Sequence, residues 1–531
     1  MRARIRRLLT LLPIMILCLA AKGQDTVTSS TEAIKHPYLE PADFYKKDII
    51  PLSLEMAIFK TLENNLNLRI SDYDRQIAGA EIEVQKGIFD LMLSSSLSVS
   101  DNDSQSASYD DNDKPGTSYS RVYSGSATLS QLLPFGGNVG LYYNTMRTNS
   151  DAAYPSINPS FKQGAGIFIQ QPLLRNFGSY FTLSGIRIAQ NNERISQEAF
   201  LLQVHSQVTA VIKAYWDLVF AIENYEVKRL TLQQAEDFLR ITTISYRTGV
   251  VPETDVLQAK AQVSTMEELV IIAESVIKAA EDALKNLMSL PRASRDWNSF
   301  FIPTDQPVVT RLEIDTEAMI DTALEKRPEY IQARIGLENS EINRRVAKNQ
   351  RMPELNLYAS AGRTGLGESH ADAWDELHTY DYHTYEAGLE FSFPLQNRSA
   401  RNRYRQAVLG YEKTEIMIAN LENSIMLEIR NAVRAIETQH KRVEATAVSV
   451  AAEKAKLESE TQRYRVGMST SYNVLSFQKD YAEALSHHIE SKVLFNRAQA
   501  ELYKASGTVL EMYRIRTDDI LKAAPVEASS E

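Results

Sequence analysis

The side chains best suited to binding a metal ion gather between residues 370 and 383. The candidates there are three histidines and three nearby acidic residues: His370, His378, His383, Asp372, Asp375 and Glu376. Imidazole and carboxylate groups are common ligands of divalent metals, but this spacing matches no zinc motif. The segment also falls in a loop between two expected strands. We therefore expect no metal site here.

A second acidic segment could suit calcium, which prefers oxygen ligands. It contains Asp101, Asp103, Asp110, Asp111 and Asp113. The glycine and the closing glutamate of an EF-hand loop are absent, so a solvated loop is expected. The chain also has no glycine-rich phosphate-binding motif, and any energy source belongs to a partner. We predict no catalytic residue, no cofactor and no metal site, and hence no enzyme.

The first 23 residues indicate a signal peptide. Four arginines precede an apolar run from Leu8 to Ala21, and small residues follow near the expected cleavage point. The apolar run is too short to span a bilayer comfortably. The single cysteine, Cys18, lies inside this segment and follows Leu17 rather than a small residue. We therefore expect an exported mature chain with no disulfide, no thiol chemistry and no lipid anchor.

Composition limits the remaining classes of function. The formal net charge of -10 is mild for 531 residues and argues against a nucleic-acid partner. Glycine (21) and proline (17) are scarce, which favours long helices.

The chain contains an internal duplication with an offset of about 218 residues. Tyr246-Arg247-Thr248-Gly249 leads into Asp255, and Tyr464-Arg465-Val466-Gly467 leads into Asn473 at the same spacing. An earlier pair of segments matches at an offset near 262, so the first copy carries about 44 extra residues. A repeat this long indicates two equivalent halves of one architecture.

Each half is expected to hold one very long helix. The segments 183–248 and 400–466 contain no proline and one interior glycine each, and a continuous helix of about 66 residues would be about 100 Å long. Return helices are expected at 253–290 and 471–513, with shorter helices at 53–89 and 314–350. Helices of this length joined by short turns predict antiparallel coiled coils.

Between the shorter helix and the long helix, each half changes to a two-residue period. In the strand 385–393, Tyr385, Ala387, Leu389, Phe391 and Phe393 share one face, and polar residues or glycine occupy the other. Segment 355–361 is its expected partner. Alternating runs in the first half begin near residues 93, 123, 139 and 165. The loops 101–118 and 365–384 are polar and expected to be mobile.

An exported chain with such strands and no apolar helix suits an outer-membrane β-barrel. Two to six strands cannot close a barrel alone, so several chains must share one. Four strands per chain would give a twelve-stranded trimer, whereas six would enlarge it. The sequence does not decide between four and six strands per chain.

Seven segments in order resemble the TolC-like outer-membrane efflux protein family. Five of them begin at Leu54 (together with the residues from Leu62), Gln171, Ala214, Ala323 and Met352, and the other two are the duplicated Tyr-Arg-x-Gly segments. The resemblance implies an α+β membrane protein: a trimeric outer-membrane β-barrel continued by a long antiparallel coiled-coil α-helical barrel in the periplasm, built from two internal repeats. It further implies the exit duct of a tripartite efflux or type I secretion system. Implied partners are outer-membrane lipid, a periplasmic adaptor protein and an inner-membrane pump or ABC exporter.

The resemblance places the two glycine-centred segments at the periplasmic helix tips that meet the adaptor. The docking residues it implies are Thr248, Gly249, Val250, Val466, Gly467 and Met468. A turn between two antiparallel helices also favours glycine for its backbone conformation, whether or not an adaptor docks there.

The resemblance also implies a periplasmic constriction near the tips. Acidic residues are common there in the family, but the matching positions here are the neutral Asn473 and Ser476, which puts strong cation selectivity in doubt. Asp255 and Tyr464 match positions that can hydrogen-bond between neighbouring coils, and we expect them to form a latch.

The expected layout is a signal peptide (1–23), a lead-in (24–50), a first repeat (51–291), a linker (292–313), a second repeat (314–516) and a tail (517–531). The alternative is a periplasmic coiled-coil adaptor or structural protein without a channel. Two strand regions and a duplication argue against that alternative. The cargo, the pump class and the ion selectivity cannot be inferred from the sequence.

Overall fold

The computed structural model describes residues 48–109, 115–151, 156–311, 313–379 and 381–516. The predicted signal peptide, nearly all of the lead-in and the C-terminal tail lie outside these ranges. The chain divides into two compact units. The helical unit comprises residues up to 76, 197–332 and 419 onward. The sheet unit comprises residues 77–196 and 333–418.

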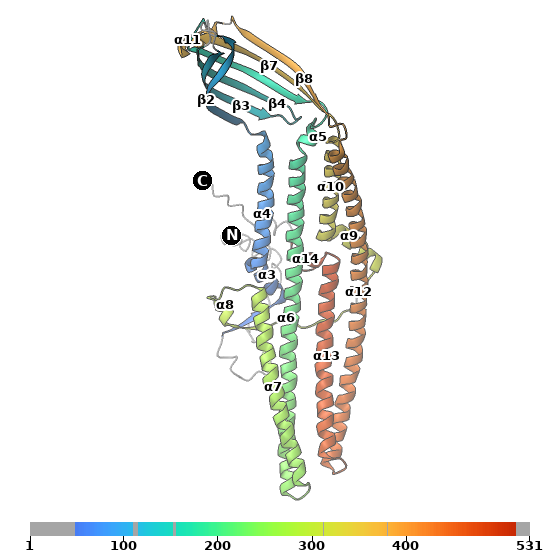
Figure 1. The fold of residues 1–531 in the computed structure, drawn as a ribbon. Helices are drawn as coiled ribbons and strands as arrows, with labels where there is room; N and C mark the ends of the chain where they lie inside the picture. The colour runs from blue at the N-terminus through green and yellow to red at the C-terminus, as the bar shows by residue number, and fades with distance from the viewer. Residues whose placement is uncertain (1–47, 110–114, 152–155, 312, 380, 517–531) are drawn as a thin grey trace, which may run out of the picture. The chain divides into compact units, whose positions relative to one another are not determined.

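Long helices dominate the chain (Figure 1). The two longest, α6 (Ser184–Arg247) and α12 (Arg398–Arg465), confirm the predicted long helices almost to the residue. The others of more than ten residues are α3 (Leu54–Asn64), α4 (Leu66–Lys86), α7 (Glu253–Leu287), α9 (Thr316–Lys326), α10 (Pro328–Asn349) and α13 (Ser471–Ala505). Within the described ranges, no helix combines the length and the apolar character needed to cross a bilayer.

The helix expected at 53–89 is two helices, because Asn65 interrupts it. Asn65 has an extended backbone (φ -62°, ψ 123°). Its side-chain oxygen accepts hydrogen bonds from the amides of Asn67 and Leu68, and so caps the start of α4. In the second half, the predicted break at Pro328 is confirmed, and this proline is the first residue of α10.

Each long helix packs against its return helix in the helical unit, α6 beside α7 and α12 beside α13 (Figure 1). Apolar side chains of α6, led by the fully buried Tyr215, Ile212 and Leu218, form the larger core with residues of α3 and α7. Ile425 and Ile429 of α12 form a second core with Phe495 of α13. Apolar faces of the paired helices pack together, as an amphipathic pattern predicts.

A parallel pair of short strands, β1 (Ile49–Leu52) and β6 (Phe300–Pro303), was not predicted. The expected layout places the first half of β1 in the lead-in, its second half at the start of the first repeat, and β6 in the linker. The tertiary structure pairs them because Phe301 and Leu52 enter the core beneath α6.

Six antiparallel strands form the sheet of the second unit, in the order β2-β3-β4-β5-β7-β8. Their bounds are β2 Met92–Tyr109, β3 Pro115–Leu132, β4 Asn138–Ser150, β5 Ser160–Pro172, β7 Glu354–Gly367 and β8 His383–Ser392. The first half of the chain thus supplies four strands, so of the two counts left open, six per chain is observed.

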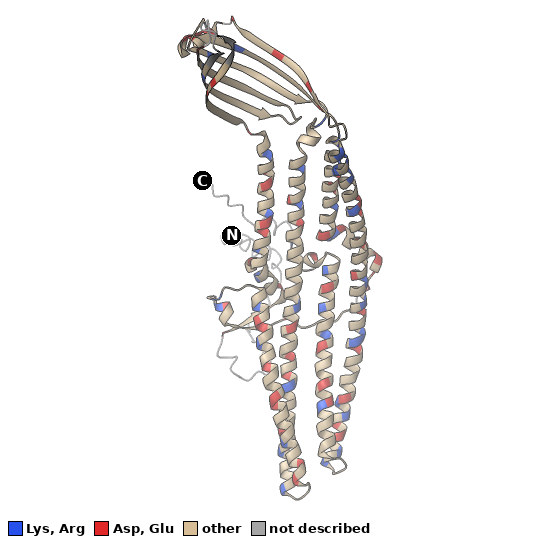
Figure 2. Cartoon of the chain, in the orientation of Figure 1, with Lys and Arg blue, Asp and Glu red and all other residues tan. Residues whose placement is uncertain are grey.

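The register gives the sheet one apolar and one polar face. Leu97 pairs with Gly125, Leu141 with Ile167, and Leu357 with Leu389, so these positions share a face. The same face carries Leu93, Val99, Leu129, Ile169, Tyr385 and Phe391. Ser96 and Ser126 pair on the other face, with Ser360 and Glu386. Charged residues are sparse on the strands and frequent on the helices (Figure 2).

The two segments predicted as loops are largely structured, which corrects that prediction. Residues 101–109 and 115–118 continue β2 and β3, so only 110–114 lie outside the described residues of that segment. A helix, α11 (His370–His378), folds onto β5 and β7 between 365 and 384. Gly365 and Gly367 permit this approach, because a Cβ at either position would collide with the backbone of Ala373.

Candidate functional site

The residues predicted to face lipid lie together on β8. Tyr385, Leu389 and Phe391 are 76%, 63% and 66% exposed in the single chain, and Ala387 lies between them on the same face. Phe393 follows the last residue of β8 and is half-buried. Large apolar side chains gathered on one open face of a sheet mark an interaction surface, and lipid as the contact stays a prediction.

The sheet has two unpaired edges, β2 and β8. All adjacent strands are antiparallel and their number is even, so these two edge strands run in opposite directions. An unpaired edge exposes a row of backbone donors and acceptors and is a template for pairing with another chain.

The first predicted docking tip is a tight turn between α6 and α7. Gly249 has φ +75°, in the left-handed region. The Gly249 amide donates to the Tyr246 carbonyl at 2.9 Å, and the Val250 amide donates to the Ser245 carbonyl at 2.9 Å. These are the two hydrogen bonds of a Schellman cap. Thr248 donates its hydroxyl back into the last helical turn, and Val250 is 73% exposed.

The second tip, between α12 and α13, repeats this geometry. Gly467 has φ +76°, its amide donates to Tyr464 at 3.0 Å, and the Met468 amide donates to Arg463 at 2.9 Å. Val466 and Met468 are exposed. Each tip therefore presents apolar side chains beside a capped glycine, as an accessible contact surface would.

Sequence reasoning missed an acidic residue beneath the second tip. The Glu460 carboxylate is 6% exposed and accepts hydrogen bonds from the Ser469 hydroxyl and from the Asn473 amide at 3.4 Å. Arg463 pairs with it at 3.2 Å. Asn473 of the predicted constriction is thus engaged within its own hairpin. Glu460 gave no local signal, because an acidic residue in a long helix is usually solvated.

Within the described residues of the single chain, Tyr464 and Asp255 form no hydrogen bond, and the latch between neighbouring coils stays a prediction. The Tyr464 ring packs on Phe238 of α6, with 5.2 Å between ring centroids, in a small core shared with Ala259, Val474 and Leu475. Among the described residues, the buried Tyr464 hydroxyl has no hydrogen-bond partner. Asp255 lies in the first turn of α7, and Ser476 is half-buried on α13. A buried hydroxyl without a partner is costly, so Tyr464 could gain a hydrogen bond in another arrangement of the tips.

Polar contacts also join the two hairpins further from the tips. Arg497 of α13 donates to Asp217 of α6 at 2.7 Å, and Lys213 pairs with Glu501. Burial raises the pKa of Asp217, although Arg497 opposes this rise. Burial lowers the pKa of Lys213, and the charges of Lys504 and Arg497 act in the same direction. These groups lie far apart in the chain, so no local pattern could have predicted them.

Described residues of both segments considered for metal binding make other contacts, whereas Asp110, Asp111 and Asp113 lie outside the described ranges. Gln163 is fully buried and donates to the His370 backbone carbonyl at 2.8 Å, and the His378 ring packs against Trp374. Asp101 pairs with Arg121 of the neighbouring strand. Across the described ranges, no three histidine, cysteine or acidic side chains group as metal ligands would.

The sequence model of the outer membrane efflux protein family matches residues 138–289 and 319–508, more than half of the 531 residues. The chain belongs to the outer membrane efflux protein family. Both tips lie within the matched ranges, whereas β2 and β3 precede them.

Individual members of the outer membrane efflux protein family resemble the chain at low identity. The alkaline protease secretion protein AprF of Pseudomonas aeruginosa is 20% identical over 383 residues, which is 70% of this chain and 76% of AprF. The outer membrane protein TolC of Vibrio cholerae is 21% identical over 362 residues, 68% of this chain and 80% of TolC.

Solved structures of outer-membrane channels share the fold. The outer-membrane channel OprN matches with a TM-score of 0.64 and 16% identity, over 86% of this chain and 90% of OprN. The Campylobacter jejuni outer membrane channel CmeC matches with a TM-score of 0.63 and 18% identity, over 89% of each chain. This outer membrane efflux protein therefore has the fold of known outer-membrane channels.

Proposed function

We propose that the protein is the passive exit duct of a tripartite efflux or type I secretion system, spanning the outer membrane as a homotrimer. Three chains would contribute eighteen strands to one barrel, and their helices would form one conduit in the periplasm. Two structurally equivalent repeats per chain would give the conduit its regular wall. Family membership favours this channel over the alternative of a periplasmic adaptor.

The pair of antiparallel edges is the observation that carries the proposal. Because β2 and β8 run in opposite directions, β8 of one chain can pair with β2 of the next in the same antiparallel pattern. Repeating this step closes a barrel and leaves no free edge. The apolar face would then meet lipid, and the serine-rich face would line the pore.

The tips would supply the periplasmic contacts. The proposed adaptor contacts are Thr248-Gly249-Val250 and Val466-Gly467-Met468, which present exposed apolar side chains on identical caps. The proposed gate lies next to them, where Tyr464 has an unsatisfied hydroxyl. Opening would separate the hairpins and break the Arg497–Asp217 contact. An inner-membrane pump or ABC exporter would provide the energy.

Disulfide trapping between chains tests the barrel. The only natural cysteine, Cys18, lies in the predicted signal peptide, so introduced thiols would be the only ones in the mature chain. Leu389→Cys is combined in turn with Leu93→Cys, Leu97→Cys and Val99→Cys, all on the apolar face of the edge strands. We expect at least one pair to give a covalent trimer on oxidation.

The matched control for trapping combines Leu389→Cys with Leu141→Cys, which lies on the same face of the interior strand β4. This pair should not cross-link. Single-channel conductance in a planar bilayer supplies the functional readout, and we expect small, stable currents. A protein that is monomeric, forms no cross-link with any edge pair and conducts no ions would contradict the proposal.

A further inference from the structure

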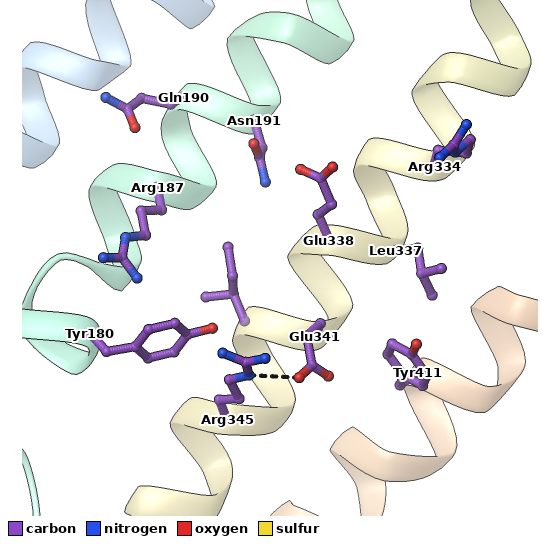
Figure 3. A pocket seen from close by; sticks show the side chains of 11 residues that line it. Tyr180, Arg187, Gln190, Asn191, Arg334, Leu337, Glu338, Glu341, Arg345 and Tyr411 are labelled. Carbon is purple, nitrogen blue, oxygen red and sulfur yellow. Dashed lines mark hydrogen bonds and ion pairs between the residues drawn. The ribbon is translucent and has the colours of Figure 1, made fainter. Parts of the chain in front are cut away.

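A groove of about 540 Å³ lies in the sheet unit between α6 and α10 (Figure 3). Its lining is rich in arginine and tyrosine and includes Tyr180, Arg187, Arg334, Arg345 and Tyr411. Figure 3 shows Tyr180 reaching from below α6 toward Arg345 of α10. The guanidinium groups of Arg187 and Arg345 lie 4.8 and 5.2 Å from the centre of the Tyr180 ring. Two guanidinium groups of the groove lining thus contact one tyrosine ring.

The groove carries more positive than negative charge, because three arginines line it with two carboxylates, Glu338 and Glu341. Glu338 pairs with Arg194 at 3.5 Å. Glu341 accepts hydrogen bonds from both Arg344 and Arg345 at 2.7 Å, so one carboxylate serves two guanidinium groups. Within the described ranges, Arg187 and Arg334 form no ion pair. Arg187 is therefore available to an anion without displacement of a carboxylate, whereas Arg345 shares its charge with Glu341.

More unpaired arginines follow at the start of α12, in the same unit. Arg398, Arg401, Arg403 and Arg405 are exposed, and none forms an ion pair with any residue that the structure describes. The first turn of α12 has no acidic residue. Cations at a helix N-terminus oppose the helix dipole, so helix stability does not explain them. Figure 2 shows basic residues at the sheet-proximal ends of α10 and α12.

A second groove, of about 500 Å³, lies on the apolar face of the sheet. Leu129, Leu141, Ile167, Ile169 and Ala361 line it, and all five belong to the face that carries Leu389 and Phe391. It occupies the half of the sheet nearer to the helices, because these residues lie toward the helix-connected ends of their strands. One unit thus combines an apolar groove with a basic one.

We propose that the sheet unit binds an anionic phospholipid, with an acyl chain in the apolar groove and the phosphate held by Arg187, Arg345, Arg398, Arg401 and Arg405. This inference rests on the proposed placement of the sheet in a membrane. Guanidinium groups bind phosphate oxygens through paired, charge-assisted hydrogen bonds. The basic collar, here meaning Arg187, Arg345, Arg398, Arg401 and Arg405, fixes the depth of the barrel in the bilayer.

Lipid retention by the purified full-length protein tests this proposal. The protein in neutral detergent is mixed with equal amounts of phosphatidylglycerol and phosphatidylcholine of identical acyl chains, and bound lipid is counted by native mass spectrometry. We expect the wild type to retain phosphatidylglycerol preferentially. R187Q/R345Q and R398Q/R401Q/R405Q should each lose this preference, by on the order of fivefold per arginine.

The matched control is K260Q/K441Q/K454Q, which removes three exposed lysines of the helical unit and should keep the preference. Equal retention of both lipids by the wild type would overturn the proposal, as would an equal loss in the lysine control. A collar variant that retains phosphatidylglycerol but changes the ion selectivity of the channel would also overturn it, because the groove would then face the pore. Conductance of the wild type is measured separately, so failure of the channel proposal would be recognised by itself.

Discussion

At the scale of single residues, backbone conformation distinguishes glycines that are otherwise alike. Gly249 and Gly467 adopt left-handed φ values, and a Cβ at either would meet no atom within 4 Å. Glycine is therefore required at both positions by the backbone conformation and not by a lack of space for a side chain. Gly410 has the same open surroundings inside the helix α12, where no such φ is needed.

Substitution by alanine should lower stability at the tip glycines, Gly249 and Gly467, and raise it at Gly410. Gly249→Ala or Gly467→Ala should destabilise its hairpin by about 1 kcal/mol, because a side chain is strained in the left-handed region. Gly410→Ala should stabilise the protein by about 0.5–1 kcal/mol through helix propensity. Denaturant unfolding and amide exchange at Val250 and Met468 would measure both effects. A stabilising Gly467→Ala would contradict the cap.

A buried histidine should make stability depend on pH. His205 of α6 is 6% exposed, and burial lowers its pKa from 6.5 to about 4, although Glu329 and Glu511 oppose the shift and Lys504 adds to it. The unfolded chain therefore binds the proton more readily than the folded chain. Stability should be complete above pH 6.5 and fall between pH 6.5 and 4, by at most about 1.4 kcal/mol per pH unit. His205→Asn should flatten this slope in unfolding experiments at pH 7, 6 and 5; an unchanged slope would show that other groups cause it.

At the scale of elements, a buried ion pair attaches the short β6 strand to α7. Lys285 and Glu281 lie 2.8 Å apart with side chains 3% and 5% exposed. Lys285 donates to the carbonyls of Trp297 and Ser299, and Glu281 accepts from the Phe301 amide. The pair therefore supplies hydrogen-bond partners to backbone groups of the segment around β6.

Removal of one partner of the Lys285–Glu281 pair should lower the free energy of unfolding far more than removal of an exposed lysine on the same helix. Lys285→Met would leave the Glu281 charge buried and unpaired, and should lower the free energy of unfolding by about 3–5 kcal/mol. Lys278→Met is the matched control, because its i,i+4 pair with Glu274 is exposed and should contribute below about 0.5 kcal/mol. Similar losses in the two variants would contradict this account.

At the scale of the whole molecule, the number of strands sets the size of the proposed barrel. Barrel diameter grows roughly linearly with strand number. The hairpin β2–β3 precedes the matched family ranges and provides two of the six strands. Its removal would leave an even number, so the new edge β4 would still run opposite to β8.

Deletion of residues 92–132 should therefore leave a trimer with a narrower barrel. The proposed barrel would fall from eighteen to twelve strands, and its diameter by roughly one third. End views by electron microscopy would measure the diameter, and native mass the trimer. A trimer of unchanged diameter would show that β2 and β3 lie outside the barrel wall.

The sequence by itself determined the features that depend on near neighbours. Absence of proline predicted α6 and α12, and the two-residue period predicted which side chains of β8 share a face. The Tyr-Arg-x-Gly segments predicted both tips, because a left-handed glycine is a local requirement. These features can be predicted from the sequence because helix and strand periodicity arise from the backbone over a few residues.

Only the tertiary structure decided the contacts that join distant segments. It united six strands in one sheet, paired β1 with β6 across more than 240 residues, placed α11 on β5 and β7, and packed Tyr464 against Phe238. It also buried Glu460 beneath its tip. Such pairings are selected by burial and hydrogen bonding over the whole fold, and no short stretch of sequence contains both partners.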